Sequence, residues 1–407
     1  MHSKTTLCNH DPKHLSEKVY FKLVSGGYDS YMKKHPMASL SKPSPAVVAQ
    51  WHKGAPNGLV NAPYSPIKSF RDFSLTPQQR INGFTVLDIF CGGGLGTVGM
   101  EAAGFTVIKA FDYEKNAVKA YKHNFGNHVE QIDITDISID TLPDADVVFG
   151  GPPCQDFSLA GKGRGVKGDR GSLIWSYLDI IKEKQPKAFI FENVKGLVSK
   201  RHIDSFNELV CKFNSVGYEV NWKLINSWDY GVAQKRERVF IVGIRKDLGF
   251  LYEFPTPLKE DARSLVLGDV IGDLPAPGEY PDHVGTKTKF RNGKSQGDRV
   301  VSVTQPSPTI RAEHHGNIEG FDPKELHSYL KKNAESSSTY PRRFTIRECL
   351  RIQSVPDSYQ FPEDVSISAQ YKIVGNGIPS RVAWYLGCAL ATQLRETTDR
   401  VTRKNAL

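Results

Sequence analysis

The pattern of hydrophobic and polar positions changes near residue 83 of this 407-residue chain. From Gly83 onward, short apolar runs alternate with segments whose apolar residues recur at helical spacing. The apolar runs predict strands at Thr85–Phe90, Val107–Phe111, Val147–Phe149, Ala188–Phe191 and Val239–Ile244. The helical spacing predicts one helix whose pattern begins at Gly99–Ala103. It predicts three more helices at Asn116–His123, Ile346–Ile352 and Val382–Leu394. This alternation predicts an α/β fold with a parallel, doubly wound sheet.

The sequence on either side of this pattern is less regular. Residues 1–80 contain several prolines and no sheet pattern, with short helices expected at Leu15–Tyr31 and Ser44–Trp51. The second of these helices either packs on the following domain or reads DNA. Irregular, proline-containing sequence also runs from about Pro255 to Pro341. We therefore predict four parts: an extension (1–80), a first domain (81–255), a smaller domain (256–340) and a segment returning to the first domain (341–407).

Composition limits the class of protein. Hydrophobic residues make up 39% of the chain and charged residues 24%, as in an ordinary globular protein. We expect no membrane span and no signal peptide, because no apolar run is long enough and the first residues lack an apolar core. The six cysteines are scattered without a C-x-x-C pair, which disfavours a disulfide framework or a zinc site and suits a reducing cytoplasm.

The formal net charge of +9 is unevenly distributed. Residues 1–80 hold eleven Lys and Arg against four Asp and Glu, whereas residues 256–340 hold eleven basic and twelve acidic side chains. The basic extension is a candidate polyanion-binding feature, although solubility alone would also explain it. The smaller domain has no excess of basic residues, so its net charge does not predict general polyanion binding.

A glycine-rich turn follows the first predicted strand. Gly94 to Gly99 matches G-x-G-x-x-G between a strand and a helix, a weak signal for a dinucleotide site. Asp112 ends the second strand, where its carboxylate could accept from ribose hydroxyls, and Asp133 ends the next extended piece. Each acid could instead cap a helix. A nucleoside site at one edge of the sheet is the better interpretation, and these residues leave NAD and other adenosine compounds open.

A cysteine lies on a stiff loop directly after the strand that ends in Phe149. Two prolines precede Cys154 in Gly-Pro-Pro-Cys-Gln, and each fixes φ and lacks an N–H donor. Glycines then alternate with basic residues, namely Lys162, Arg164, Lys167 and Arg170. We favour a nucleophile meeting a polyanion over a buried structural cysteine, because a core cysteine would not need such a loop.

Two further charged groups adjoin predicted strands. Glu192 follows the apolar run Phe189–Phe191, and desolvation there would raise its pKa and make it a proton donor near neutral pH. A helix-capping role is the alternative for this residue. Arg236 and Arg238 precede or begin the strand at Val239, and strand alternation would point both to one face. A solvated surface charge run is the alternative for that pair.

Eight segments together resemble the cytosine-C5 DNA methyltransferases, particularly the bacterial modification enzymes. They occur in the family's order and cover roughly residues 83–395, apart from the segment before Arg342. The segments are DIFCGGGLGTVGMEAAGF, FDYEKNAVKAYKHNF, GGPPCQDFSLAGKG, DRGSLIW, FENVKGL, QKRERVFIVGIR, RRFTIRECLRIQSVPDSY and YKIVGNGIPSRVAWYLG. A single motif could arise by chance, whereas eight in order could hardly do so.

The resemblance implies roles for individual residues. It implies an S-adenosylmethionine site at Phe90, Gly92, Asp112, Tyr113, Asp133 and Asn376, which displaces the nicotinamide interpretation. It implies catalytic roles for Cys154 as nucleophile, Glu192 facing cytosine N3, and Arg236 and Arg238 beside the base and nucleophile. It also implies a DNA-contacting closing loop with Gln155, Ser158 and Arg170, near which Lys162 and Arg164 could hold phosphates.

In the smaller domain, Ser307–Ala312 resembles the family's Thr-Leu/Ile/Val element near the flipped base. This makes Thr309, Ile310 and Arg311 candidate DNA-binding residues. The nearby polar side chains are weaker candidates for reading base edges, namely Glu313, His314, His315 and Asn317. For any one of them, an ordinary loop residue is the simpler interpretation. The resemblance names 81–255 the catalytic domain and 256–340 the target-recognition domain.

The expected activity is therefore methylation of cytosine C5, flipped out of a short duplex DNA sequence, within a restriction-modification system. We expect double-stranded DNA and a cognate endonuclease as partners, no metal, a monomer in catalysis, and a cytoplasmic protein that joins the nucleoid when bound to DNA. An RNA cytosine-C5 methyltransferase of the same fold is one alternative, and a non-catalytic DNA-binding regulator another. An NAD-dependent dehydrogenase would explain only the glycine turn.

Overall fold

The computed structural model describes residues 73–153 and 173–405, apart from 289, 292, 294–296, 313–317 and 331–339. Contacts divide the chain into two units, Met1–Arg71 and Asp72–Leu407, and the described residues all belong to the second. The helices expected within residues 1–80 lie outside the described residues, so they stay predictions. Side chains are described as far as Thr397 in the last helix.

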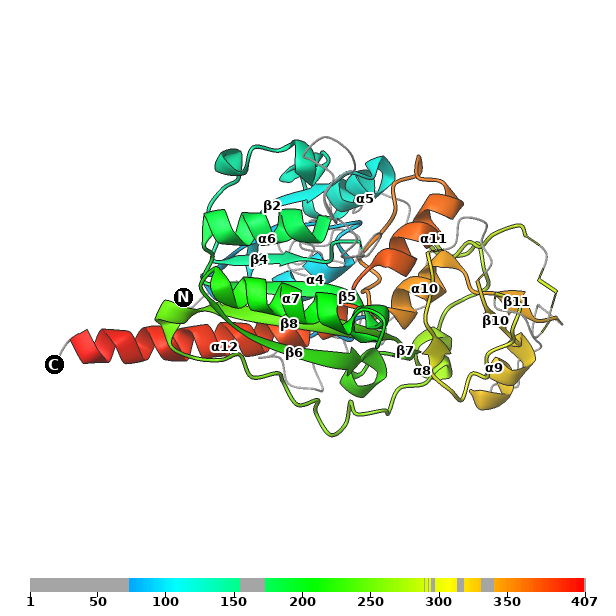
Figure 1. Cartoon of the computed structure of the whole chain (residues 1–407). Coiled ribbons are helices and arrows are strands. Elements are labelled where there is room, and N and C mark those ends of the chain that lie inside the picture. The colour runs from blue at the N-terminus through cyan, green and yellow to red at the C-terminus, as the bar shows by residue number, and fades with distance from the viewer. Residues whose placement is uncertain are drawn as a thin grey trace, which may run out of the picture. The chain divides into compact units, whose positions relative to one another are not determined.

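A seven-stranded sheet forms the centre of the described chain (Figure 1). Its strand order is β3-β2-β1-β4-β5-β8-β6. The strands are β1 (Thr85–Ile89), β2 (Thr106–Asp112), β3 (Val129–Gln131), β4 (Val147–Gly150), β5 (Ala188–Val194), β6 (Tyr218–Asn226) and β8 (Glu237–Arg245). All five predicted strands are present. The apolar runs identified them because both faces of each strand are covered.

The prediction of a wholly parallel sheet was wrong at β8, which pairs antiparallel with both β5 and β6. The chain passes from β6 to β8 through a short connection that holds the 3₁₀ helix Ser227–Tyr230 and strand β7 (Gln234–Lys235). A connection this short favours an antiparallel pair, whereas a parallel pair needs a crossover of a dozen or more residues. The sequence analysis had not predicted β6. The antiparallel pairing places Glu192 of β5 opposite Phe240 of β8.

Helices cover both faces of the sheet (Figure 1). Helices α4 (Leu95–Ala102) and α12 (Ser380–Asn405) pack on one face, where Met100 and Leu390 join a cluster with strand residues such as Val242. Helices α6 (Leu173–Lys184) and α7 (Ile203–Ser215) cover the other face, where Tyr177 and Phe213 pack on Phe189. Helix α5 (Lys115–Phe125) packs near the β2–β3 edge. This layering is the doubly wound α/β arrangement that the sequence predicted.

Helix α4 begins at Leu95, four residues before the predicted start. Its N-cap is Gly94, whose φ of 83° lies in the left-handed region that favours glycine. A Cβ at Gly94 would also lie 2.4 Å from the Phe125 ring. The glycines were therefore interpreted correctly as a turn, but the helix after that turn was placed too late.

The remaining elements lie beside one end of the sheet (Figure 1), and a second apolar cluster joins most of them. They are α8 (Leu267–Ile271), β9 (Ser307–Pro308), β10 (Gly320–Phe321), α9 (Pro323–Tyr329), β11 (Arg342–Arg343), α10 (Ile346–Ile352) and α11 (Ile367–Asn376). The cluster joins residues of the 256–340 segment, such as Val270 and Ile318, to Leu350 and Val374. The four-part division of the chain remains a prediction.

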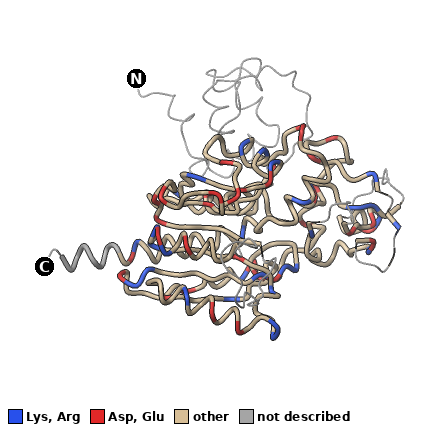
Figure 2. Tube along the Cα trace, turned by 45° about the horizontal axis from the view of Figure 1, so that its top comes forward, with Lys and Arg blue, Asp and Glu red and all other residues tan. Residues whose placement is uncertain are grey.

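Along the described chain, Lys and Arg are interspersed with Asp and Glu (Figure 2). None of the helices described here combines the length and the apolar character needed to cross a membrane.

Candidate active site

The glycine turn (Cys91–Gly94) connects β1 to α4. The Gly92 N–H donates to the Asp112 carboxylate at 2.8 Å, and the Gly94 N–H donates to the Cys91 carbonyl at 2.9 Å. Phe90 precedes the turn with a φ of 63°, a conformation that costs a non-glycine residue about 1 kcal/mol or more. Asp112 thus fixes the turn through its backbone, and the strained Phe90 starts the chain reversal.

A hollow opens at the carboxyl ends of β1, β2 and β3. Five of the six predicted cofactor residues lie at this place: Phe90, Asp112, Tyr113 and Asp133 line the hollow, and Gly92 binds Asp112. The remaining lining residues are Phe111, Ile132, Ile134 and Leu173. Apolar side chains and carboxylates thus line one hollow, a combination that suits an adenosine compound with the base between apolar walls and the ribose hydroxyls on an acid.

The two predicted acids have different surroundings. Asp112 accepts hydrogen bonds from the N–H groups of Gly92 and Glu114, yet burial raises its pKa. Asp133 accepts from the N–H and hydroxyl of Thr135 and caps a 3₁₀ helix, Ile134–Asp136. Capping, the alternative for both acids, therefore holds for Asp133, although its side chain still lines the hollow. Helix α5 is capped instead by Glu114.

Asn376, the sixth predicted cofactor residue, is the exposed last residue of α11 and does not line the hollow. The neighbouring backbone lies against the start of α4. A Cβ on Gly377 would come within 2.4 Å of the Leu95 side chain, and Ser380 Oγ donates to the Leu95 carbonyl. Asn376 is therefore placed near the end of the glycine turn rather than at Asp112.

The second half of the site lies at the carboxyl ends of β4 and β5. Glu192, 8% exposed, is the fifth residue of β5 and does not cap a helix. The loop after β4 passes directly over it: a Cβ on Gly151 would lie 2.8 Å from Glu192 Oε2. The neighbouring Asn193 Nδ2 donates to the Pro152 carbonyl at 2.9 Å. These contacts hold Gly151–Pro153, the residues before Cys154, against the Glu192 carboxylate.

Glu192 is paired with an arginine and is still difficult to ionise. Arg238 Nε lies 3.0 Å from Glu192 Oε1, and both side chains are mostly buried. Burial raises the pKa of Glu192, while the charges of Arg238 and Arg236 oppose that rise without cancelling it. The predicted upward shift of this pKa is confirmed. A carboxyl group with such a pKa can hold a proton nearer neutral pH than an ordinary glutamate.

The two arginines of the QKRER segment have different partners. Arg236 is 1% exposed and donates to three carbonyl groups, those of Ile310, Gly375 and Gly377, at 3.0–3.1 Å. Burial lowers its pKa to about 9, and the positive charge of Arg238 acts in the same direction. Arg238 instead faces Glu192. Arg236 therefore connects the start of β8 to the Ser307–Ala312 segment and to the end of α11.

The Thr309–Arg311 segment lies beside β7, because β7 pairs with β9. Thr309 Oγ1 donates to the Lys235 carbonyl, and the fully buried Ile310 side chain belongs to the second apolar cluster. Thr309 and Lys235 also line a hollow of about 450 Å³, together with Arg299, Val300, Val301, Pro306 and Pro308. Ile310 thus fixes the backbone, whereas Thr309 faces an open, partly basic hollow.

Several predicted site residues lie outside the described residues. They are Cys154, Gln155, Ser158, Lys162, Arg164, Lys167, Arg170, Glu313, His314, His315 and Asn317. Their roles stay predictions. The described residues contain no group of three or more His, Cys, Asp or Glu side chains arranged to hold a metal ion.

Comparison with known proteins identifies the family of this fold and site. Residues 84–391 match the sequence model of the C-5 cytosine-specific DNA methylases. The chain belongs to this family. The match spans the glycine turn, Glu192, both arginines and α11, so the methylase segment includes every site residue predicted from the resemblance.

Similar methylases are found in several bacteria. The chain is 37% identical to the Type II methyltransferase M.FnuDI of Fusobacterium nucleatum, over 77% of this chain and 95% of that protein. It is 30% identical to M.HhaI of Haemophilus parahaemolyticus, over 78% and 97%. The fold also matches the structure of S. pombe Dnmt2 methyltransferase with a TM-score of 0.58 at 15% identity, covering 77% of this chain and 99% of that one.

Sequence reasoning missed some residues of the methylase site. Ile132 and Leu173 line the hollow near Asp112, and an apolar residue beside a predicted acid was the available signal for Ile132. Asn193 directly follows Glu192, and its bond to Pro152 joins two segments that the sequence analysis treated separately. Leu173 begins α6 well downstream in the chain; it lies in the DRGSLIW segment of the resemblance, but no site role was assigned to it.

Proposed function

We propose that this methylase transfers a methyl group to C5 of one cytosine in a specific short sequence of double-stranded DNA. The paired Glu192 and Arg238 carry the proposal: a buried carboxyl group with a raised pKa lies under the loop that leads to Cys154. Cytosine needs a proton or a strong hydrogen bond at N3 when a nucleophile adds at C6, and this carboxyl group can supply either.

S-adenosylmethionine would lie in the hollow at the carboxyl ends of β1–β3, and when bound it supplies an electrophilic methyl group. The lining supports this choice, since Phe90 and Ile132 offer apolar walls and Asp112 and Asp133 offer acceptors for ribose hydroxyls and an amino group. The neighbouring Gly92 carries no Cβ, so the backbone allows a close approach at the turn.

The residues of the chain would prepare the cytosine for this transfer. The thiolate of Cys154 adds at C6, and the C5–C6 electron pair becomes available at C5, as in an enamine. Glu192 protonates N3 or donates a strong hydrogen bond to it, while Arg238 binds O2 and holds the Glu192 carboxyl in place. Once C5 has taken the methyl group, loss of the C5 proton to a base, departure of the Cys154 thiolate and return of the N3 proton to Glu192 restore the aromatic ring. Since C6 is enclosed within a duplex, the base must first be flipped out, at a cost of a few kcal/mol.

The names of the relatives support a place in a restriction-modification system, because the similar bacterial enzymes are Type II methyltransferases. We propose that methylation protects cellular DNA in the cytoplasm from a cognate endonuclease and that the enzyme acts as a monomer. The hollow lined by Lys235, Arg299 and Thr309 supports DNA contact on the target-recognition side.

Methylation of plasmid DNA in cells tests this function. We expect bisulfite sequencing to show 5-methylcytosine at one position of one short motif. Glu192→Gln should lower the methylation rate of purified enzyme by about 10²-fold or more, because the neutral amide cannot give N3 a proton. Glu219→Gln is the matched control, since Glu219 is exposed on the edge strand β6, and it should keep the wild-type rate.

Two further measurements separate the alternatives. Duplex DNA with 5-fluorocytosine at the target should form a covalent adduct when S-adenosylmethionine is present, and a Cys154→Ala variant that still forms it would refute the nucleophile. Competition between duplex DNA and structured RNA identifies the substrate class. Preferential methylation of RNA, or no 5-methylcytosine in any context from folded protein, contradicts the proposed function.

A further inference from the structure

Tyr359 contacts the glycine turn from a distant part of the chain. Its hydroxyl group donates to the Gly93 carbonyl at 2.8 Å, across 266 residues of sequence, and its side chain is 2% exposed. The backbone at Gly93 has little freedom around this bond. A Cβ there would lie 2.4 Å from Ile373 Cγ2 and 2.8 Å from the Tyr359 hydroxyl oxygen. Tyr359 and Ile373 therefore close on the turn from one side.

Asp112 binds the same turn one residue earlier. The Gly92 N–H binds the Asp112 carboxylate, and the Gly93 carbonyl accepts from Tyr359. Two adjacent residues are thus fixed by side chains of different elements, one at the end of β2 and the other in the loop between α10 and α11. The Asp112 bond was accessible to sequence reasoning because Asp112 ends a strand, whereas nothing local predicts the Tyr359 bond.

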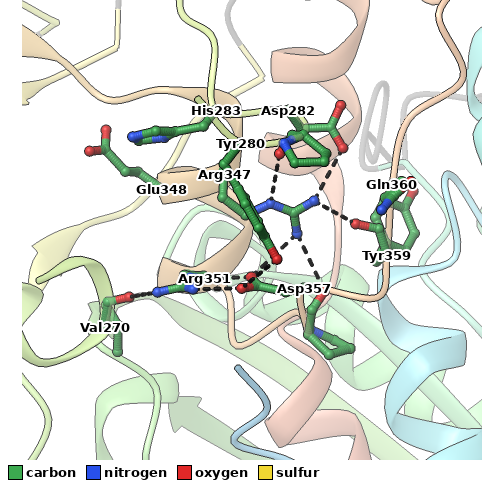
Figure 3. Close-up of polar contacts among 12 residues, drawn as sticks. Val270, Tyr280, Asp282, His283, Arg347, Glu348, Arg351, Asp357, Tyr359 and Gln360 are labelled. Carbon is green, nitrogen blue, oxygen red and sulfur yellow. Dashed lines mark hydrogen bonds and ion pairs between the residues drawn. The ribbon is translucent and has the colours of Figure 1, made fainter. Parts of the chain in front are cut away.

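The backbone of Tyr359 is itself held by an ionic cluster around two buried arginines, which we define as Asp273, Asp282, Arg347, Arg351 and Asp357. Figure 3 labels all of these residues except Asp273. Arg347 Nη2 donates to the Tyr359 carbonyl at 2.8 Å and lies 3.2 Å from Asp282 Oδ2. Arg351 binds Asp357 through two nitrogen atoms and also lies 2.5 Å from Asp273. The arginine side chains are both fully buried.

The ionic cluster thus connects the glycine turn to the smaller domain. Asp273 and Asp282 belong to the 256–340 segment, whereas Arg347, Arg351 and Asp357 belong to α10 and the loop after it. Tyr359 is the residue that contacts both sides, since its carbonyl binds Arg347 and its hydroxyl binds Gly93. A buried guanidinium with several partners restricts the backbone that it binds.

We propose that Tyr359 is a positioning residue for the methyl donor. Its hydroxyl sets the position of the Gly93 peptide, and through it the part of the glycine turn that faces the adenosine compound. This inference rests on the proposed function, because it assumes that S-adenosylmethionine binds at the turn. Tyr359 itself does not line the hollow at Asp112, so it acts through the backbone rather than by touching the ligand.

The test is Tyr359→Phe, which keeps the ring packed against Phe125 and Phe361 and removes only the hydroxyl group. We expect the Kd of S-adenosylmethionine, measured by isothermal titration calorimetry on the full chain, to rise about fivefold, which corresponds to about 1 kcal/mol. In steady-state assays, KM for S-adenosylmethionine should rise in the same proportion, while KM for DNA and kcat at saturation stay near wild type.

The matched control is Tyr252→Phe. Tyr252 is equally buried, its hydroxyl also donates to one carbonyl, that of Leu386 in α12 at 3.0 Å, and it does not line the hollow at Asp112. The control should lose a similar amount of stability and keep the wild-type Kd. An unchanged Kd in Tyr359→Phe, or an equal rise in both variants, would overturn the inference alone. Absence of binding by the wild-type protein would overturn the proposed function together with it.

Discussion

Buried carboxylates occur in two regions of this molecule, and their electrostatic settings are opposite. Under the glycine turn, Asp88 accepts from the Thr97 hydroxyl at 2.6 Å, and Asp112 accepts from two backbone N–H groups. Around α10, Glu348 binds both terminal nitrogens of Arg342, and Asp357 binds Arg351 and Arg347. In the first region the hydrogen-bond donors to the acids are neutral hydroxyl and N–H groups. In the second region the donors are charged guanidinium groups.

The pKa shifts follow this difference. Burial raises the pKa of Asp88 to about 7 and raises that of Asp112 as well. Glu348 is just as buried, but the charge and hydrogen bonds of Arg342 lower its pKa. Asp282, at the edge of the ionic cluster, shows the intermediate case, because burial still outweighs Arg347 and its pKa is raised. Burial alone therefore does not set the direction of a pKa shift, because two hydrogen bonds and the charge of Arg342 reverse it at Glu348, whereas a single arginine does not at Asp282.

The comparison distinguishes the glycine turn, where a ligand is expected to bind, from the region around α10, which we call the scaffold. At the glycine turn Asp112 lines the hollow, where its carboxylate is placed to accept hydrogen bonds from a ligand, whereas Asp88 is enclosed beneath it. Around α10 the acids are paired with arginines, and Asp282 and Asp357 hold Arg347 where it donates to the Tyr359 carbonyl. A binding site uses acids whose pKa is shifted and whose oxygens can reach a ligand. A scaffold uses acids whose charge is paired with arginines.

Removal of a shared acid from the scaffold should have the largest effect. Asp357→Ala leaves Arg347 and Arg351 buried with fewer counter-charges, and we expect the free energy of unfolding to fall by about 3–5 kcal/mol. Urea denaturation followed by circular dichroism measures this loss. Glu208→Ala removes an exposed pair with Lys212 and should change stability by about 0.5 kcal/mol or less. A loss from Asp357→Ala as small as that of the control would contradict the scaffold interpretation.

The two regions also differ in how far the sequence could predict them. The strands around the glycine turn were found because each is a short apolar run, and Asp112 and Glu192 were found because each adjoins such a run. The raised pKa of Glu192 followed from the same reasoning. In this region the relevant contacts lie at the ends of neighbouring strands, so the order of elements along the chain already brings them together.

The scaffold could not be predicted in the same way. Arg347 binds Asp282, which lies 65 residues earlier, and Tyr359 binds Gly93 across 266 residues. Ion pairs of this kind have no periodicity, and each of these charges would pass for a surface residue. Some local signals were nevertheless available. Asp322 before Pro323 marks the start of α9, and Thr345 with Glu348 forms the capping box of α10.

The next largest effect is the change in the free energy of unfolding with pH that Asp88 causes. Its unfolded pKa is near 3.8 and its folded pKa about 7, so the unfolded state ionises first as pH rises. The wild-type protein should therefore lose stability relative to Asp88→Asn between about pH 4 and pH 7, by on the order of 4 kcal/mol, with no further change above that range. Neighbouring Asp112 and Glu101 act in the same direction as burial. Urea denaturation of both proteins from pH 4 to pH 8 measures the difference, and parallel profiles would show that Asp88 is ionised at little cost.

The smallest effect is expected at Glu348, whose contribution to stability should change with pH in the opposite direction to that of Asp88. Glu348 has a lowered folded pKa, so its contribution to stability is complete above its unfolded value of 4.5 and is lost as pH falls through the folded value. Glu348→Gln keeps an oxygen that can accept from the Thr345 N–H, and glutamine also suits a capping box, so only the charged pairing with Arg342 is lost. We expect the variant to be about 1 kcal/mol less stable at pH 7, with the difference shrinking below pH 4.5. The same urea series, extended to pH 3, decides the sign. If the gap instead widened toward acid, Arg342 would not be the cause of the lowered pKa, and the contrast between the two regions would fail at its best-paired residue.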